Sequence, residues 1–160
     1  MRLALYQPDQ AGNVGTIIRL AACLGVPLDL IEPMGFPWGD KALKRAGMDY
    51  AELANVTRHA DWAAFEDALT GRLVLFTTRG AVRLPEARFD SGDVLLFGAE
   101  SSGVPDDVHR RAGMRVAIPQ VEGTRSLNLA VAAGIGLAEA VRQADLWVGG
   151  SRLRPTIPPR

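Results

Sequence analysis

The chain has 160 residues, of which 48% are hydrophobic and 22% are charged, an ordinary composition for a single globular domain with a buried core. Its 18 basic and 18 acidic residues give a formal net charge of zero, which excludes a surface that is basic all over but leaves room for a local phosphate-binding patch. No hydrophobic run is long enough to span a bilayer, and no signal-like segment opens the chain, so we expect a cytoplasmic protein without a membrane partner.

Short runs that are hydrophobic at nearly every position alternate with helical stretches along the chain. Strands of this kind are typical of a parallel sheet covered by helices on both faces, so the sequence predicts an α/β fold over residues 1–148. The remaining residues, 149–160, are rich in Pro and Arg and are expected to form a flexible tail. In chain order, the predicted elements are a strand (3–6), a helix (14–24), a strand (28–31), a helix from Asp40 to Gly47, a weak strand (53–57), a helix capped by Asp61 and ending before Gly71, two strands (73–76 and 94–97), a short helix after Pro105, a strand (116–118) and a helix (127–143).

The last predicted helix is hydrophobic on nearly every side for three turns, and the first is similar. A helix that is hydrophobic all round must be buried all round, which one chain of this size rarely achieves for a terminal helix. We therefore predict a homodimer packed through these two helices. Deep burial inside one subunit is the alternative.

The chemistry of the remaining side chains argues against a metal site. The single cysteine, Cys23, falls in a hydrophobic helical stretch and is expected to be a buried, inert thiol. The two histidines, His59 and His109, are far apart in the sequence, and His59, beside Arg58, is expected on a solvated surface. No metal ligand set is therefore predicted.

Three polar segments follow predicted strands, where α/β proteins commonly bind ligands. Glycine after a strand lets a ligand approach the backbone, and the start of a helix offers unpaired N–H donors. Taken alone, the middle segment is equally consistent with a simple turn. The candidate binding residues in these segments are Phe76 and Thr77, then Gly98 and Glu100, and finally Ile118, Ser126, Leu127 and Asn128.

Arg19 lies inside an otherwise hydrophobic helical segment that also contains Asn13. A buried guanidinium without a partner is costly, so Arg19 is expected to reach a carboxylate, a phosphate or water. A structural ion pair with Glu32 or Glu100 is one interpretation, and Asn13 could simply cap the helix. Other basic residues, among them Arg79 after a strand, form either a solvated face or a phosphate-binding rim.

Together these segments resemble the SPOUT superfamily of RNA methyltransferases, and most closely its TrmL-type (YibK-like) tRNA 2′-O-methyltransferases. The resemblance extends from Leu3 to Gln143. It is carried by Asn13-x-Gly15-x-x-x-Arg19, residues 31–36, 45–50 and 56–59, Phe97-Gly98-x-Glu100, and Ser126-Leu127-Asn128.

The resemblance implies a carboxyl-terminal trefoil knot, a homodimer, and S-adenosylmethionine as the cofactor. It also implies 2′-O-methylation of the wobble nucleotide of tRNA, a C or U at position 34. Another tRNA or rRNA position, or an RNA-binding module without catalysis, are the alternatives. By the same resemblance, Arg19 is catalytic and Asn13 and Asn128 orient it and the substrate hydroxyl, while the cofactor-binding residues are Phe76, Thr77, Gly98, Glu100, Ile118, Ser126 and Leu127.

Overall fold

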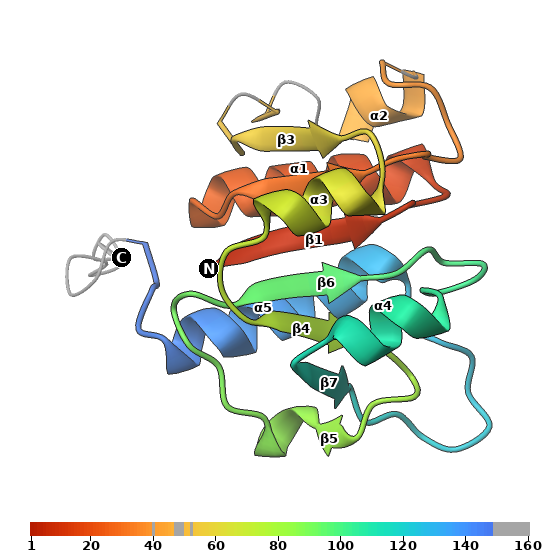
Figure 1. Cartoon of the computed structure of the whole chain (residues 1–160). Coiled ribbons are helices and arrows are strands. Elements are labelled where there is room, and N and C mark those ends of the chain that lie inside the picture. The colour runs from red at the N-terminus through yellow and green to blue at the C-terminus, as the bar shows by residue number, and fades with distance from the viewer. Residues whose placement is uncertain (40, 47–49, 52, 149–160) are drawn as a thin grey trace, which may run out of the picture.

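The computed structural model describes residues 1–39, 41–46, 50–51 and 53–148 (Figure 1). Seven strands form one sheet in the order β3-β2-β1-β6-β4-β7-β5, and every neighbouring pair is parallel. The predicted class, an α/β fold around a parallel sheet, is thereby confirmed. The strands are β1 (Arg2–Tyr6), β2 (Leu28–Ile31), β3 (Val56–His59), β4 (Leu73–Phe76), β5 (Val82–Arg83), β6 (Val94–Phe97) and β7 (Met114–Ala117).

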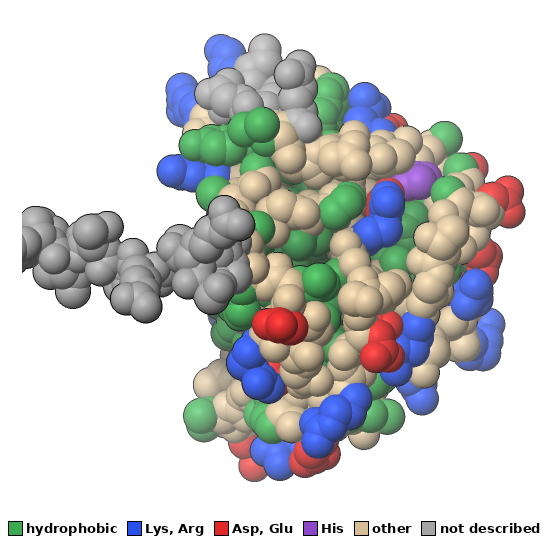
Figure 2. Space-filling view, turned by 90° about the vertical axis from the view of Figure 1, so that its left-hand side faces the viewer, with side chains coloured by type: hydrophobic (Ala, Val, Ile, Leu, Met, Phe, Trp, Pro, Cys, Tyr) green, Lys and Arg blue, Asp and Glu red, His purple; other side chains and the backbone are tan. Residues whose placement is uncertain are grey.

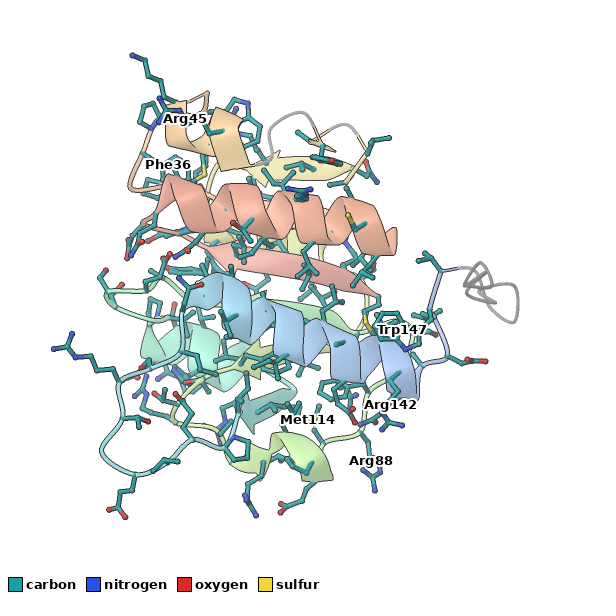
Figure 3. All side chains as sticks on the ribbon, turned by 180° about the vertical axis from the view of Figure 1, so that it is seen from behind. Phe36, Arg45, Arg88, Met114, Arg142 and Trp147 are labelled. Atoms are coloured by element: carbon teal, nitrogen blue, oxygen red, sulfur yellow. The ribbon has the colours of Figure 1, made fainter. Side chains whose placement is uncertain are left out.

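Helices cover both faces of the sheet, as predicted. From behind, α1 and α5 lie side by side across one face (Figure 3), while α3 and α4 lie over the other (Figure 1). The short helix α2 packs against α1. The helices are α1 (Ala11–Leu24), α2 (Lys41–Ala46), α3 (Trp62–Ala68), α4 (Asp106–Arg111) and α5 (Leu129–Gln143), with a 3-10 turn η2 (Leu84–Glu86).

The core is divided by the sheet into two layers. In the central strand β1, Leu3 and Leu5 belong to the layer beneath α1 and α5, whereas Ala4 and Tyr6 belong to the layer beneath α3 and α4. Successive side chains of a strand point to opposite faces, so a strand covered on both sides must be hydrophobic at every position. This is the physical origin of the continuous hydrophobic runs in the sequence.

Several predicted boundaries differ from the observed ones. The weak strand predicted at residues 53–57 is β3, which starts three residues later, and β7 starts two residues before the predicted 116–118. The edge strand β5 was not predicted, because a two-residue strand carries no detectable periodicity. The predicted cap Asp61 is confirmed, since its carboxylate accepts a hydrogen bond from the Ala64 amide at 2.8 Å. Asp40, Gly47 and the predicted tail lie outside the described residues.

His59 is buried, which corrects the prediction of a solvated histidine. Its Nε2 lies 2.8 Å from Oδ1 of Asp29, a residue that is only 1% exposed. Arg2 donates to both carboxylate oxygens of Asp29, at 2.7 and 2.8 Å. The three strands β1, β2 and β3 are thus joined by one buried carboxylate.

Cys23 is exposed, so the expected buried thiol is wrong. It lies on the outer face of α1 with Thr16 and Arg19, which are also exposed. A hydrophobic stretch indicates burial of a helix as a whole, but the position of each residue around the axis decides which side faces the sheet.

The expectation that α5 is buried all round is also wrong within one chain. Val131 is 49% exposed and Ile135 is 38% exposed on its outer side, and Leu146, Trp147 and Val148 add further exposed hydrophobic surface beyond its end. Figure 3 shows Trp147 beside the carboxyl end of this helix. In the described part of the chain, none of the helices combines the length and hydrophobicity needed to cross a membrane.

The buried carboxylate makes a stability prediction. Replacing Asp29 with Ala leaves Arg2 and His59 without their shared partner, so Asp29→Ala should lower the free energy of unfolding by about 3 kcal/mol in urea titrations. The matched control is Glu66→Ala, which breaks the exposed Arg111–Glu66 pair and should cost less than about 1 kcal/mol. Equal losses for the two variants would contradict the structural role of Asp29.

Candidate active site

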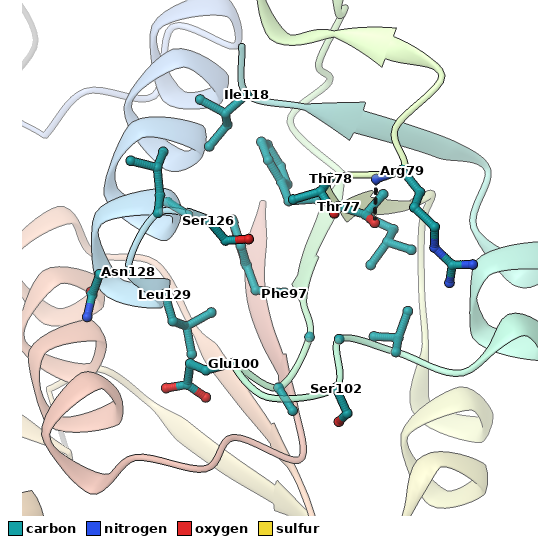
Figure 4. A pocket seen from close by; sticks show the side chains of 18 of the residues that line it. Thr77, Thr78, Arg79, Phe97, Glu100, Ser102, Ile118, Ser126, Asn128 and Leu129 are labelled. Atoms are coloured by element: carbon teal, nitrogen blue, oxygen red, sulfur yellow. Dashed lines mark hydrogen bonds between the residues drawn. The ribbon is translucent and has the colours of Figure 1, made fainter. Parts of the chain in front are cut away.

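A cavity of about 480 Å³ lies at the carboxyl ends of β4, β6 and β7 (Figure 4). The chain passes from β6 to α4 on one face of the sheet and from β7 to α5 on the opposite face. Diverging connections of this kind open a crevice at the strand ends, where α/β proteins place their ligands.

Nine of the ten predicted site residues line this cavity, and only Arg19 does not. Their convergence from loops far apart in the sequence was an expectation of the motif pattern. The nine are Asn13, Phe76, Thr77, Gly98, Glu100, Ile118, Ser126, Leu127 and Asn128.

Gly98 is required by the turn that follows β6. The Ala99 amide donates to the Gly103 carbonyl at 3.0 Å, and the Gly103 amide returns the bond to Ala99 at 2.8 Å. A Cβ atom on residue 98 would lie 2.5 Å from the Gly103 carbonyl carbon, which is too close for any real contact. The turn and the cavity wall are therefore the same structure, and both interpretations of this segment hold.

Glu100 holds the loop after β6 against α1. Its Oε1 accepts a hydrogen bond from Asn13 Nδ2 at 2.7 Å, and its Oε2 accepts one from the Asp9 amide at 3.0 Å. Asn128 Nδ2 donates in turn to Asn13 Oδ1 at 2.9 Å, while Asn128 Oδ1 caps α5 by accepting from the Ala130 amide at 2.9 Å. One polar chain therefore connects α1, the β6 loop and the start of α5.

These contacts decide two alternatives left open by the sequence. Asn13 is not the N-cap of α1, because the helix begins at Ala11 after Gln10. Asn128 is the N-cap of α5, which explains why the helix begins at Leu129 and not at the predicted residue 127.

Phe76 contributes mainly its backbone to the cavity. Its ring stacks on Phe97 with centroids 4.7 Å apart and packs against Gly136 of α5, leaving only 7% of the residue exposed. The next residue, Thr77, donates its amide to the Val116 carbonyl at 2.9 Å and accepts from the Arg79 amide at its hydroxyl (Figure 4). The wall formed by β4 is thus fixed from both sides.

Arg19 lies outside the cavity on the exposed face of α1. Its guanidinium lies 5.5 Å from the centroid of the Tyr50 ring, a cation–π arrangement. The proposed ion pairs are wrong, because Glu32 binds Arg58 at 2.5 Å and Glu100 binds Asn13. Among the described residues no carboxylate forms an ion pair with Arg19, so in one chain its guanidinium reaches water.

His109 also lines the cavity, and no sequence pattern identified it. It lies on α4, and burial lowers its pKa from 6.5, with the positive charges of Arg79 and Arg115 acting in the same direction and Asp106 opposing them. At neutral pH it is therefore an uncharged imidazole. Among the described residues no group of three or more His, Cys, Asp or Glu side chains is placed to hold a metal ion.

The fold and the site define an α/β protein with a ligand cavity built from three strand-end loops and the first turns of two helices. Residues 1–138 match the SpoU rRNA Methylase family. The chain belongs to this family, which confirms the resemblance to SPOUT methyltransferases.

Individual relatives cover nearly the whole chain. A tRNA (cytidine(34)-2′-O)-methyltransferase of Ancylobacter novellus is 52% identical, over 89% of this chain and 92% of the relative, and one of Escherichia coli K12 is 42% identical over 89% and 93%. A structure described as giving insights into the 2-OH methylation of C/U34 on tRNA has 47% identity and a TM-score of 0.84, covering 89% of this chain and 94% of that one. An AdoMet-bound rRNA methyltransferase of Sinorhizobium meliloti has 32% identity and a TM-score of 0.76, covering 88% of this chain but 55% of its own.

The lowered pKa of His109 predicts a pH dependence of stability. Above pH ~6.5 the imidazole is neutral in both the folded and the unfolded chain, so its contribution to stability is complete. As the pH falls below this value, the unfolded chain takes up the proton more readily, and stability is lost. His109→Gln should therefore lose less stability than the wild type between about pH 7 and about pH 5 in urea titrations. Parallel losses in the two proteins would refute the assignment.

Proposed function

We propose that this protein transfers a methyl group from S-adenosylmethionine to the 2′-oxygen of the ribose of nucleotide 34 in tRNA, a cytidine or uridine. The observation that carries the proposal is the convergence of nine predicted site residues on one cavity. Relatives named for this reaction match nearly their whole length, whereas the rRNA methyltransferase of Sinorhizobium meliloti is matched over 55% of its length. The tRNA assignment is therefore favoured over an rRNA one.

The residues of the cavity fit such a cofactor. Its volume is in the range of small-molecule sites, and hydrophobic side chains such as Leu75, Val116 and Leu129 lie beside the hydroxyls of Thr77 and Ser126. Gly98 leaves room for close approach to the backbone. When bound, the cofactor supplies a methyl group already activated by a sulfonium, so the contribution of the protein is to position the reactants and exclude water.

Arg19 is proposed to anchor the substrate rather than to act as a base. A guanidinium has a pKa above about 12 and does not give up its proton in proteins, whereas its fork of donors suits a phosphate or a developing alkoxide. Arg19 would hold the ribose and a neighbouring phosphate and stabilise the oxygen as its negative charge grows. Asn13 and Asn128, joined to Glu100, would orient these groups.

Because Arg19 does not line the cavity of its own chain, the site needs a second copy. The exposed Val131 and Ile135 on α5, which lies beside α1, form a hydrophobic surface suited to a homodimer. A two-fold interface through these helices would bring Arg19 of one protomer toward the cavity of its partner. The apolar face and the position of Arg19 thus support the same assembly.

Three further calls are part of this proposal. The segment from β7 to α5 lies beside the loops after β4 and β6, as the expected trefoil knot would require. Residues 1–148 would form a single methyltransferase domain followed by the tail, residues 149–160. A protein that acts on tRNA would meet its substrate in the cytoplasm.

The function is tested by incubating the protein with labelled S-adenosylmethionine and unmodified tRNA, followed by nucleoside mapping. The expected product is a 2′-O-methylated nucleoside at position 34 only. Methylation at another position would replace the proposed target, and cofactor binding without transfer to any tRNA would favour a non-catalytic RNA-binding protein.

The shared site is tested by subunit complementation. Arg19→Ala should abolish transfer while retaining cofactor affinity, and Gly98→Ala should lose cofactor binding because its Cβ displaces the Gly103 backbone. Co-expressed with different affinity tags, the two inactive chains should form mixed dimers with about half the wild-type activity, since one of the two sites then has both an intact cavity and an intact arginine.

The control is the preparation of each variant alone, which must be dimeric and inactive. Mixed dimers without activity would place Arg19 in the site of its own chain. In single-turnover reactions with saturating cofactor, wild-type rates for Arg19→Lys and Arg19→Ala would remove this residue from the chemistry.

A further inference from the structure

A second, smaller cavity of about 260 Å³ lies beside the first. It is lined only by charged or imidazole side chains, namely those of Arg79, Asp106, His109, Arg110 and Arg115. Arg79 and His109 line both cavities, and Figure 4 shows the guanidinium of Arg79 pointing away from the larger one. The two cavities are therefore neighbours along one edge of the sheet.

Three separate segments build this second cavity. Arg79 follows β4, and Arg110 lies in the last turn of α4. Arg115 lies on β7 directly beside Leu75 of β4, so it is on the face of the sheet covered by α3 and α4. Sequence analysis had marked only Arg79 as a possible phosphate ligand, because the other two arginines approach it only in the folded chain.

The cavity has an excess of positive charge. Asp106 is its single carboxylate and binds Arg79 at 3.2 Å. Within the described ranges, neither Arg110 nor Arg115 is ion-paired with a carboxylate. With His109 uncharged at neutral pH, the lining carries two more positive than negative charges.

At the opposite edge of the sheet, two arginines have partners. Arg2 lies 2.7 Å from Asp29 and Arg72 lies 2.7 Å from Asp93, both at the amino ends of strands. Figure 2 looks onto that end of the molecule, where basic and acidic side chains are intermixed. Arg110 and Arg115, beside the ligand cavity, are therefore available for an external anion in a way that Arg2 and Arg72 are not.

Resting on the proposed function, we propose that Arg79, Arg110 and Arg115 form a binding site for a phosphodiester of the tRNA strand, next to the nucleotide whose ribose enters the larger cavity. Guanidinium groups suit phosphate because their planar donors bind two oxygens at once. Single-stranded loops are the parts of RNA that can be splayed into protein pockets, and phosphate contacts fix their register. The site would hold the strand while its neighbouring sugar is methylated.

The test uses Arg110→Ala and Arg115→Ala, since neither residue lines the larger cavity. Each variant should weaken tRNA binding about tenfold, as expected for the loss of a charge-assisted contact. Each should also lower the slope of log K against log salt concentration by about 0.7, the value for one phosphate on a single strand. Affinity for S-adenosylmethionine, measured by calorimetry, should be unchanged.

The matched control is Arg111→Ala, which removes the same charge from the same helix at a residue paired with Glu66 outside the cavity. If this variant weakens tRNA binding as much as Arg110→Ala, the effect is general electrostatics and the site is refuted. Weaker cofactor binding in the Arg110 or Arg115 variants would instead assign the cavity to the cofactor carboxylate.

The two proposals fail differently. Wild-type protein that binds and methylates tRNA, with Arg110 and Arg115 variants that bind it equally well and with the same salt slope, would overturn the phosphate site alone. Wild-type protein that does not bind tRNA would overturn the proposed function and the phosphate site together.

Discussion

The geometry of the site depends on the carboxylate of Glu100, which binds Asn13 and the Asp9 amide at the same time. These contacts fix the loop after β6 to the start of α1, and Asn128 extends the connection to the start of α5. Segments more than 80 residues apart in the sequence therefore meet at one group. Hydrogen bonds to an ionised acceptor are short and strong, so this arrangement holds the loops in place before any ligand binds.

The same arrangement explains which side chains are free to do chemistry. Both oxygens of Glu100 have partners, so its role is to position neighbours, and the Phe76 ring is buried in the core. The ligand would then be recognised largely by backbone groups of the loops, with few side chains reaching it. The cations that could meet a polyanionic substrate lie elsewhere, with Arg19 on the outer face of α1 and Arg110 and Arg115 beyond the rim.

The parallel sheet relates these cations to the cavity. Because all strands run in one direction, their carboxyl ends share a single edge, and the opposite edge carries the Arg2–Asp29 and Arg72–Asp93 pairs. A chain with no net charge can thus present local positive charge where a phosphate would bind. The exposed hydrophobic side of α5 lies on a different face, so a partner subunit and the proposed phosphate site would not compete for the same surface.

The sequence by itself determined the α/β class, most strands and helices, the Asp61 cap and the loops that line the cavity, because continuous hydrophobic runs and strand-end polar segments are local patterns. Only the tertiary structure decided the partners: Asn13 rather than Arg19 for Glu100, Asp29 for His59, and the meeting of Arg79, Arg110 and Arg115. Hydrophobic composition also could not distinguish the sheet-facing side of α1 and α5 from the side that exposes Cys23 and Val131. Burial can be read from the average character of a segment, but pairing and facing depend on distances between residues that the chain brings together only when it folds.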